Sequence, residues 1–133
     1  MKNILTYGTF DLFHNGHVQL LKRAKSLGGK LFVGVSSDLF NYAKGKESYF
    51  NEIERIEILK SCKYVDYVFL EKSWDQKVQD ISKYDIDHFV MGDDWIGEFD
   101  HLKNFCKVSY FKRTPGISTS KIKNELHTLE IVA

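Results

Sequence analysis

Short β-rich runs alternate with helix-spaced apolar residues along the whole chain, and this alternation restricts the fold more than any other feature. Apolar runs with the length and the aromatic or β-branched content of strands cover residues 3–7, 31–35, 67–70, 88–91 and 108–111. Between and after them, apolar residues recur at helical spacing over 18–27, 53–59, 78–81 and 122–129. Strict alternation of strand and helix requires right-handed crossovers and a parallel sheet. The sequence therefore predicts an α/β fold, in which a five-stranded parallel sheet carries helices on both faces.

The composition favours one domain over residues 1–133 and disfavours several other classes of protein. Hydrophobic residues make up 43% of the 133 residues, enough for a packed core, and the single proline, Pro115, leaves no candidate linker. No apolar run approaches the roughly 18 residues of a membrane helix, and the apolar stretch after Met1 is too short for a signal peptide. Cys62 and Cys106 lack the spacing of a metal site or a disulfide framework. We expect a cytoplasmic protein whose cysteines pack in the core.

Charge is distributed unevenly although the formal net charge is only +1. Residues 1–46 carry a balance of +5, residues 47–100 one of −8, and residues 101–133 one of +4. Two basic ends are what a phosphate-rich ligand would need if both ends met at it. A solvated surface of mixed charge accounts for the same pattern, and nucleic-acid binding is disfavoured because no basic and aromatic stripe accompanies the small net charge.

The segment after the first strand combines a glycine, a helix start and two histidines. Gly8 lets the backbone approach a ligand closely, and free N–H groups at the start of the next helix form a site for anions. His14 and His17 are three residues apart, so on a helical turn they share one face and can donate hydrogen bonds to phosphate oxygens. The pair could instead ligate a metal, but no third ligand stands at an obvious spacing. The position between strand and helix favours phosphate.

Residues 113–120 predict a second phosphate cradle near the other end of the chain. Arg113 carries a planar, permanently charged guanidinium that suits phosphate oxygens. The Pro-Gly pair at 115–116 predicts a turn, and three successive hydroxyl side chains at 118–120 stand where the last helix begins. An N-capped helix would explain Ser118 alone, but it would not explain the arginine and the successive hydroxyls.

Together these segments resemble the signatures of a known enzyme superfamily. His14-Asn15-Gly16-His17, preceded by Gly8-Thr9-Phe10-Asp11, is similar to the His-x-Gly-His signature of the nucleotidyltransferases. The stretch from Arg113 to Ser120 is similar to their second signature in its cytidylyltransferase form, with Ser120 where the family usually has threonine. Segments 71–81 and 90–95 are similar to those of bacterial glycerol-3-phosphate cytidylyltransferases. The resemblance covers about residues 2–126 and implies a single Rossmann-like cytidylyltransferase domain over residues 1–133.

The resemblance also implies a site for CTP and a site for a small phosphorylated alcohol. The residues that it assigns to the nucleotide are Gly8, Thr9, Phe10, Asp11, His14, Gly16, His17, Lys46, Asp94, Arg113, Thr114, Gly116, Ile117, Ser118, Thr119 and Ser120. It assigns to the acceptor substrate Lys44, Trp74 and Lys77. The catalytic roles fall to His14, His17, Lys44, Lys46 and Arg113. No protein ligand for a metal is implied, because Mg²⁺ is expected to be carried mainly by the CTP phosphates.

Several of these residues have other interpretations. Lys44 and Lys46 flank a glycine as in a solvated loop tip, and Trp74 is also consistent with a surface tryptophan that covers the core. Asp66 is either structural or near an interface between subunits.

Arg55 and the aspartate pair Asp93 and Asp94 are similarly open. Arg55 either adds charge near the pyrophosphate or pairs with Glu52 or Glu54 on its own helix. Asp94 either accepts a hydrogen bond from an amino group of the base or joins Asp93 in a metal site, the less favoured alternative.

The activity that the resemblance implies is cytidylyl transfer. A phosphate oxygen of glycerol 3-phosphate attacks the α-phosphorus of CTP in line, which gives CDP-glycerol and pyrophosphate for a teichoic acid or capsule precursor. The histidines then act as electrostatic donors rather than as a base, and the family expectation is a homodimer. The alternatives are a related enzyme that uses ATP, another phosphorylated alcohol or a sugar phosphate, and a nucleotide-binding regulatory module without activity.

Overall fold

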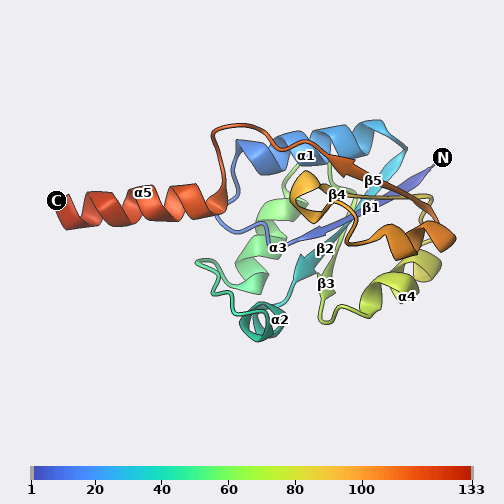
Figure 1. Cartoon of the computed structure of the whole chain (residues 1–133), viewed down its shortest axis with the longest axis horizontal. Helices are drawn as coiled ribbons and strands as arrows, with labels where there is room; N and C mark the ends of the chain where they lie inside the picture. The colour runs from blue at the N-terminus through green and yellow to red at the C-terminus, as the bar shows by residue number, and fades with distance from the viewer. Residues whose placement is uncertain (1, 133) are drawn as a thin grey trace.

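The computed structural model describes residues 2–132, with the side chains of residues 2–126. Within this part of the chain one sheet is formed by the strands β1 (Asn3–Gly8), β2 (Lys30–Ser36), β3 (Tyr67–Glu71), β4 (His88–Gly92) and β5 (Lys107–Phe111). Every ladder is parallel, and the strand order is β3-β2-β1-β4-β5 (Figure 1). The predicted α/β fold with a five-stranded parallel sheet is confirmed for the described residues.

The crossovers are helical, as the alternation predicts. The helices are α1 (Asn15–Ser26), α2 (Asp38–Ala43), α3 (Glu52–Lys60), α4 (Gln76–Lys83) and α5 (Thr119–Val132), with 3₁₀ turns η1 (Asp93–Trp95) and η2 (Asp100–Asn104). Helix α2 is absent from the sequence prediction because six residues are too few to display an apolar period. It begins at Ser37, whose Oγ accepts the N–H of Phe40 at 3.1 Å.

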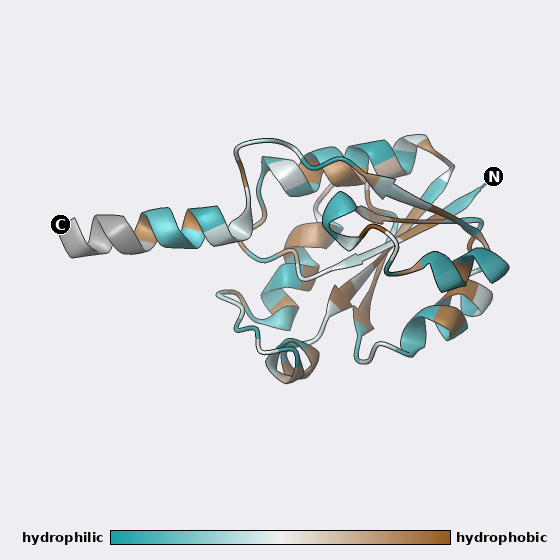
Figure 2. Ribbon diagram, in the orientation of Figure 1, coloured by the Kyte–Doolittle hydropathy of each residue, from teal (hydrophilic) through white to brown (hydrophobic). Residues whose placement is uncertain are grey.

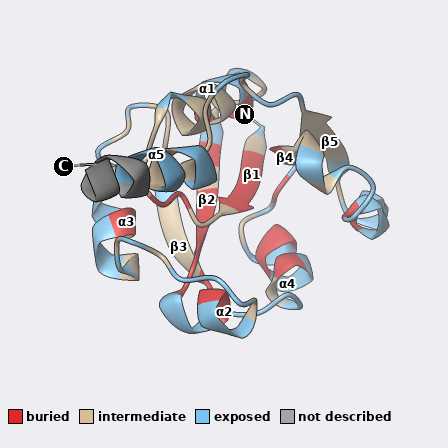
Figure 3. Cartoon of the chain, turned by 60° about the vertical axis from the view of Figure 1, so that its left-hand side comes forward, coloured by how far each residue is buried: buried red, intermediate tan, exposed pale blue. Residues whose placement is uncertain are grey.

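Two apolar cores form because side chains alternate between the faces of each strand. On one face Ile4 of β1 and Val33 of β2 pack with Leu21 of α1 and Leu59 of α3. The opposite core is formed by Leu5, Tyr7, Ile81, Ile86, Phe89, Met91, Phe99 and Leu102, from β1, β4, α4 and the segments that follow them. The hydropathy view shows hydrophobic residues gathered on the strands (Figure 2), and the burial view shows β1 deeply buried (Figure 3).

The cysteines pack as predicted, one against each core. Cys62 lies against the core under α1 and α3, and Cys106 lies against the core under α4. Both thiols are free, and burial raises the pKa of Cys106. No helix in the described range is both long enough and apolar enough to cross a bilayer.

The sheet reverses its strand order between β1 and β4, and this reversal places the functional site. The ladder joins Ile4 to His88 and Leu5 to Phe89 and does not continue to the carboxyl ends of the two strands, all of whose residues the structure describes. A switch in strand order of this kind leaves a crevice at the carboxyl ends of the strands. Helix α5, after β5, starts beside this edge and extends away from the sheet (Figure 1).

Candidate active site

A cleft of about 540 Å³ opens at the carboxyl ends of the strands. The predicted site residues that line it are Gly8, Thr9, Phe10, Asp11, His14, Gly16, His17, Lys44, Lys46, Trp74, Lys77, Asp94, Arg113, Thr114, Ile117, Ser118, Thr119 and Ser120. Gly116 is not part of the lining; it lies in the adjoining turn with a φ of 80°. The structure thus brings the two signatures to one cleft, while the individual roles stay predictions.

The first turn of α1 holds the two histidines through hydrogen bonds to the backbone. The Nδ1 atom of His14 accepts the N–H of Gly16 at 3.0 Å, and the Nδ1 atom of His17 accepts the N–H of His14 at 3.2 Å. The rings stack with centroids 3.8 Å apart. A Cβ atom at position 16 would lie 2.8 Å from the His14 ring, which explains why a glycine stands between the histidines.

These contacts fix the tautomer of both rings. A backbone N–H only donates, so each Nδ1 atom is unprotonated and each neutral ring carries its hydrogen on Nε2. Burial, reinforced by the adjacent His14, lowers the pKa of His17 to about 3. Burial and the charge of Arg113 lower the pKa of His14 as well. At pH 7 both imidazoles are therefore neutral, and each has an Nε2–H group that no described residue accepts and that can donate to an anion.

The second signature lies beside the histidine turn. Ile117 lies close to Gly16: a Cβ atom built at position 16 would be 3.4 Å from the Ile117 side chain. The Oγ atom of Ser118 accepts the N–H of Lys121 at 3.0 Å, so Ser118 does cap α5. Arg113 is exposed, and no hydrogen bond or ion pair joins its guanidinium to another described residue. The cap accounts for the serine, and the arginine side chain stays available for a ligand.

Asp11 fastens three segments of the cleft wall together. Its buried carboxylate accepts the N–H groups of Tyr49 at 2.6 Å and Phe50 at 2.9 Å, and it pairs with Lys123 at 3.1 Å. Its backbone carbonyl accepts the hydroxyl of Thr119 at 2.8 Å. Burial by itself would raise the pKa of this carboxyl, but the two N–H groups and Lys123 lower it overall. The carboxylate expected to contact the nucleotide thus binds the chain itself, tying the lysine-bearing loop and α5 to the first signature.

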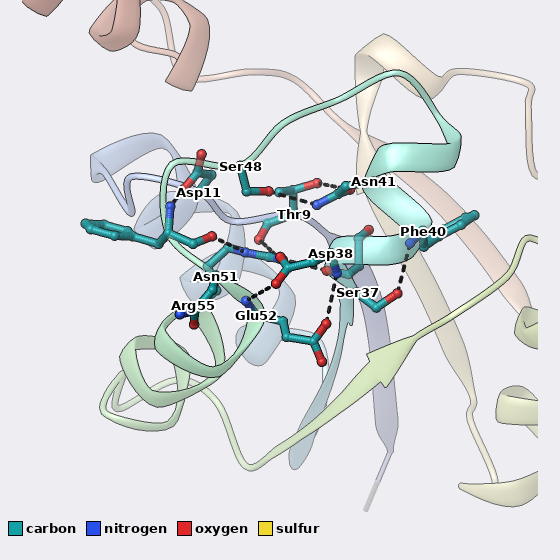
Figure 4. Close-up of polar contacts among 12 residues, drawn as sticks. Thr9, Asp11, Ser37, Asp38, Phe40, Asn41, Ser48, Asn51, Glu52 and Arg55 are labelled. Carbon is teal, nitrogen blue, oxygen red and sulfur yellow. Dashed lines mark hydrogen bonds and ion pairs between the residues drawn. The ribbon is translucent and has the colours of Figure 1, made fainter.

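Arg55 also contacts the lysine-bearing loop, within the network of polar contacts that Figure 4 shows. Its side chain is 0% exposed. One Nη1 atom donates to the carbonyls of Thr9 at 3.0 Å and Ser36 at 2.7 Å. Nε donates to the carbonyl of Phe50 at 3.0 Å, and Nη2 pairs with Asp38 at 2.7 Å. Each nitrogen of this guanidinium therefore has a partner in the chain.

Of the two sequence interpretations of Arg55, the pairing on its own helix was wrong, and added charge near a pyrophosphate stays a prediction. The residue pairs with Asp38 rather than with Glu52 or Glu54, and its buried guanidinium does not itself line the cleft. Glu52 instead exchanges hydrogen bonds with the backbone and carboxylate of Asp38, at 3.0 and 3.1 Å. The carboxylate that pairs with Arg55 belongs to Asp38 of α2, the helix that the sequence did not predict.

The three residues predicted to bind the acceptor, Lys44, Trp74 and Lys77, lie together in one half of the cleft. Lys44 Nζ lies 5.3 Å and Lys77 Nζ 5.0 Å from the Trp74 ring centroid, so both ammonium groups approach one indole. Lys77 is 4% exposed and forms an ion pair with Glu71 at 2.5 Å. Burial lowers the pKa of Lys44 to about 8.

Carboxylate clusters that would hold a metal are not found among the described residues, where no group of three or more His, Cys, Asp or Glu converges. Asp94 lines the cleft and Asp93 does not, so the two carboxylates do not form a pair facing it. Asp66 lies elsewhere: it accepts hydrogen bonds from Lys25 at 2.5 Å and from the N–H of Leu31 at 2.8 Å. These contacts give Asp66 a structural role.

Sequence reasoning missed several residues of the cleft wall. They are Tyr7, Gln19, Arg23, Ser36, Glu71, Trp95 and Phe99 among others. Ser36 and Glu71 end β2 and β3, and a polar residue at the carboxyl end of a parallel strand was the available signal.

Comparison with known proteins gives the family of the chain. The cytidylyltransferase-like family matches residues 5–131, and the chain belongs to that family. It is 54% identical to the glycerol-3-phosphate cytidylyltransferase of Staphylococcus aureus, with 96% of this chain and 96% of that protein aligned. It is 56% identical to the enzyme of the same name from Bacillus subtilis, over 95% of this chain and 98% of that protein.

The fold also has a solved counterpart. The crystal structure of the lipopolysaccharide core biosynthesis protein from Thermoplasma volcanium superposes with a TM-score of 0.70 at 26% identity, covering 86% of this chain and 97% of that one. The likeness supports the Rossmann-like description of the single α/β unit.

Proposed function

We propose that this protein joins CTP and glycerol 3-phosphate to give CDP-glycerol and pyrophosphate. The observation that carries the proposal is one cleft in which the starts of α1 and α5 meet, with the histidine pair, Arg113 and two lysines around it. Two helix N-termini together with fixed positive charge favour a polyanion such as a triphosphate. The identity of 54% and 56% to glycerol-3-phosphate cytidylyltransferases over nearly the whole chain selects the nucleotide and the acceptor.

The reaction needs positioning and charge stabilisation rather than a covalent intermediate. A phosphate oxygen of the acceptor forms a bond to the α-phosphorus of CTP while the bond from that phosphorus to the bridging oxygen breaks and pyrophosphate leaves. A phosphate monoester is already a nucleophile near neutral pH, so no base has to activate it. The protein brings two anions together and offsets the charge that spreads over the phosphoryl oxygens.

The histidines supply that stabilisation as hydrogen-bond donors. A ring whose pKa lies near 3, as for His17, is a weak base at pH 7, whereas its Nε2–H group remains a donor. Lys44, Lys46 and Arg113 add positive charge, and removing one such group typically costs about 2.7–4 kcal/mol of transition-state stabilisation. Trp74 and Lys77, with Lys44, contact the acceptor.

Mg²⁺ is proposed to enter with the nucleotide. The donor groups of the cleft are mostly N–H, ammonium and guanidinium groups, which suit phosphate oxygens and not a divalent cation. Asp94 and Glu47 are the cleft carboxylates to which no described residue donates a hydrogen bond or an ion pair, so these two are placed to contact the hydrated ion. When bound, Mg²⁺ neutralises charge on the triphosphate and the departing pyrophosphate.

Assembly and cellular context follow the family expectation. We infer that two copies of the chain form a homodimer, consistent with apolar side chains such as Leu39, Tyr42 and Ile53 that are at least 70% exposed. Sedimentation velocity tests this, and a monomer at micromolar concentration would contradict it. Synthesis where CTP is available places the enzyme in the cytoplasm, with CDP-glycerol as a precursor of a teichoic acid or a capsule.

The assay that tests the activity is pyrophosphate release from CTP and, separately, from ATP, each with and without glycerol 3-phosphate. Release is expected only with CTP and glycerol 3-phosphate together; phosphocholine and phosphoethanolamine serve as competing acceptors. Equal turnover with ATP would reassign the nucleotide, and tight CTP binding without turnover would indicate a regulatory module.

The histidine assignment has a separate test. His14→Ala and His17→Ala should lower kcat by roughly 10²–10³-fold with a much smaller change in CTP affinity, because the donors act on charge that develops in the transition state. His101→Ala, on η2, is the control. Loss of CTP affinity with kcat intact would refute the assignment.

A further inference from the structure

The acceptor half of the cleft contains a buried carboxylate that the mechanism above does not use. Glu71 ends β3, and its side chain is 3% exposed. Its Oε2 atom accepts a hydrogen bond from Lys77 Nζ at 2.5 Å, and its Oε1 atom accepts one from Ser36 Oγ at 3.4 Å. Burying a carboxylate is unfavourable unless it is paired, so the partners of Glu71 explain its presence here.

The Ser36 hydroxyl extends this contact to a second lysine. Lys44 Nζ donates to Ser36 Oγ at 3.2 Å, and the serine in turn donates to Glu71. One carboxylate therefore faces two ammonium groups, Lys77 directly and Lys44 through a hydroxyl. Two positive charges against one negative charge leave an excess that a phosphate group of the acceptor can neutralise.

Aromatic rings surround the two ammonium groups. Lys77 Nζ lies 4.7 Å from the ring centroid of Tyr7 and 5.1 Å from that of Phe99. Lys44 Nζ lies 4.2 Å from the ring centroid of Phe40. In surroundings with little water, charges interact more strongly than in bulk solvent. The charge of Glu71 therefore has a large influence on both lysines.

The titration of Lys44 is consistent with this influence. Burial lowers its pKa to about 8, and the charge of Glu71 opposes the decrease, while Lys46, Lys77 and Arg55 add to it. Burial raises the pKa of Glu71, and Lys77 is the main opposing influence. Without the carboxylate, Lys44 would lose its proton at a lower pH.

We propose that Glu71 is a positioning residue for the phosphorylated acceptor: it holds the ammonium groups of Lys77 and Lys44 in place and keeps Lys44 charged. The inference rests on the proposed function, because it concerns the phosphate of that acceptor. Glu71 does not touch the reacting atoms; it acts through the two lysines.

Glu71→Gln tests the proposal because it keeps the shape of the side chain and removes its charge. We expect the KM for glycerol 3-phosphate to rise about tenfold at pH 8, the loss typical of a hydrogen bond to a charged group, and to rise less at pH 7. The KM for CTP should change by less than about twofold, since the nucleotide lies at the other signatures. Above roughly pH 6 a phosphate monoester is already a dianion, so the pH dependence reports on the protein.

Two further variants separate charge from packing. Asp80→Asn removes another buried carboxylate, one that accepts the Tyr7 hydroxyl at 2.6 Å; it should lower stability without changing the pH dependence of the acceptor KM from that of the wild type. Glu71→Asp keeps the charge and should restore the wild-type pH dependence. If the acceptor KM rises no more in Glu71→Gln than in Asp80→Asn, the proposal is wrong.

A second readout does not depend on turnover. In protein labelled with ¹³C-lysine, the Cε resonance of Lys44, assigned with Lys44→Arg, should titrate at a lower pH in Glu71→Gln than in the wild type. Ser36→Ala, which removes the bridging hydroxyl, should shift the Lys44 titration in the same direction. This variant replaces Glu71→Gln in the test if Glu71→Gln does not fold. An unchanged Lys44 titration in the variant that folds would overturn the inference. Absence of pyrophosphate release by the wild-type protein would instead refute the proposed function.

Discussion

Arg55 and Arg113 have identical side chains in opposite surroundings. Arg55 is 0% exposed, and it uses its donors on three carbonyls and Asp38. Arg113 borders the cleft in an exposed position without a hydrogen-bond or ion-pair partner among the described residues. The same side chain thus has two different uses: Arg55 binds segments of the chain to each other, whereas the donors of Arg113 are not taken up by the described residues.

The comparison extends to the segments around the two arginines. The loop that carries Lys44 and Lys46 is held by Arg55 and Asp11, so its backbone is positioned before a substrate arrives. The second signature is joined to the rest mainly through α5, where Thr119 and Lys123 contact Asp11.

The largest expected effect concerns Arg55. Arg55→Met should lower the free energy of unfolding by about 3 kcal/mol or more, because it leaves Asp38 and buried carbonyls without their donors. Urea unfolding measures the loss, and Lys60→Met on the exposed end of α3 should change it by less than about 0.5 kcal/mol. A loss below about 1 kcal/mol for Arg55→Met would erase the contrast between the two arginines.

Arg113→Met should show the opposite pattern. We expect kcat to fall by roughly 10²–10³-fold, the effect of removing one preorganised donor, while the free energy of unfolding changes by less than about 0.5 kcal/mol. Arg113→Lys restores the charge without the planar fork and should recover only part of the rate. Steady-state kinetics with CTP and glycerol 3-phosphate give the rates; a stable, fully active Met variant would contradict the assignment.

The histidine turn sharpens the comparison through pH. The pKa of His17 is about 3 in the folded protein and near its ordinary value of 6.5 when unfolded. Between these two pKa values the unfolded chain binds more protons than the folded protein. The contribution of His17 to the free energy of unfolding is therefore complete above about pH 6.5 and is lost as the pH falls toward 3. From pH 7 to pH 5 we expect a loss of about 1–2 kcal/mol.

Urea unfolding at both pH values measures that loss. His17→Gln should reduce the dependence on pH, and His101→Gln should retain it. If the free energy of unfolding changes equally with pH in the two variants, His17 is not the group responsible for the change.

The smallest effect concerns the contact of α5 with Asp11. Lys123 is partly exposed, so Lys123→Met should cost less than about 1 kcal/mol of unfolding free energy. The KM for CTP should rise about twofold, because the second signature is then less firmly joined to the first. Lys103→Met, which removes an exposed pair with Asp100, is the control. An equal KM in both variants would mean that the α5 contact does not influence nucleotide binding.

The sheet was predictable from the sequence because its central strands β1, β2 and β4 are largely buried and read as nearly continuous apolar runs. The predicted run at 31–35 lies within Lys30–Ser36, and the run at 88–91 within His88–Gly92. Helix α2 was not predictable, since six residues capped by Ser37 carry no distinct period. Its position depends on Asp38 pairing with Arg55, a contact between segments 17 residues apart.

The cleft was predictable where short motifs define it and not where single charged residues support it. The histidine and arginine signatures could be found in the sequence because of their residue spacing and their positions after predicted strands. Glu71 and Arg55, in contrast, look like ordinary surface charges, because burial of a charge depends on partners such as Ser36 that only the folded chain brings near. Asp11 was expected at the nucleotide for its place in the motif, whereas its carboxylate is directed to the backbone of the lysine loop.

The first turn of α1 links folding to chemistry through two nitrogen atoms. Because Gly16 N–H and His14 N–H occupy the Nδ1 atoms, unravelling this turn would let either imidazole rotate and present a lone pair to the polyphosphate. In the proposed mechanism that lone pair would repel the phosphate oxygens, which need a hydrogen-bond donor. If the proposed mechanism holds, a substitution that loosens the beginning of this helix lowers kcat even when every reactive side chain is retained, so ring orientation should be checked before turnover in any variant repacked there.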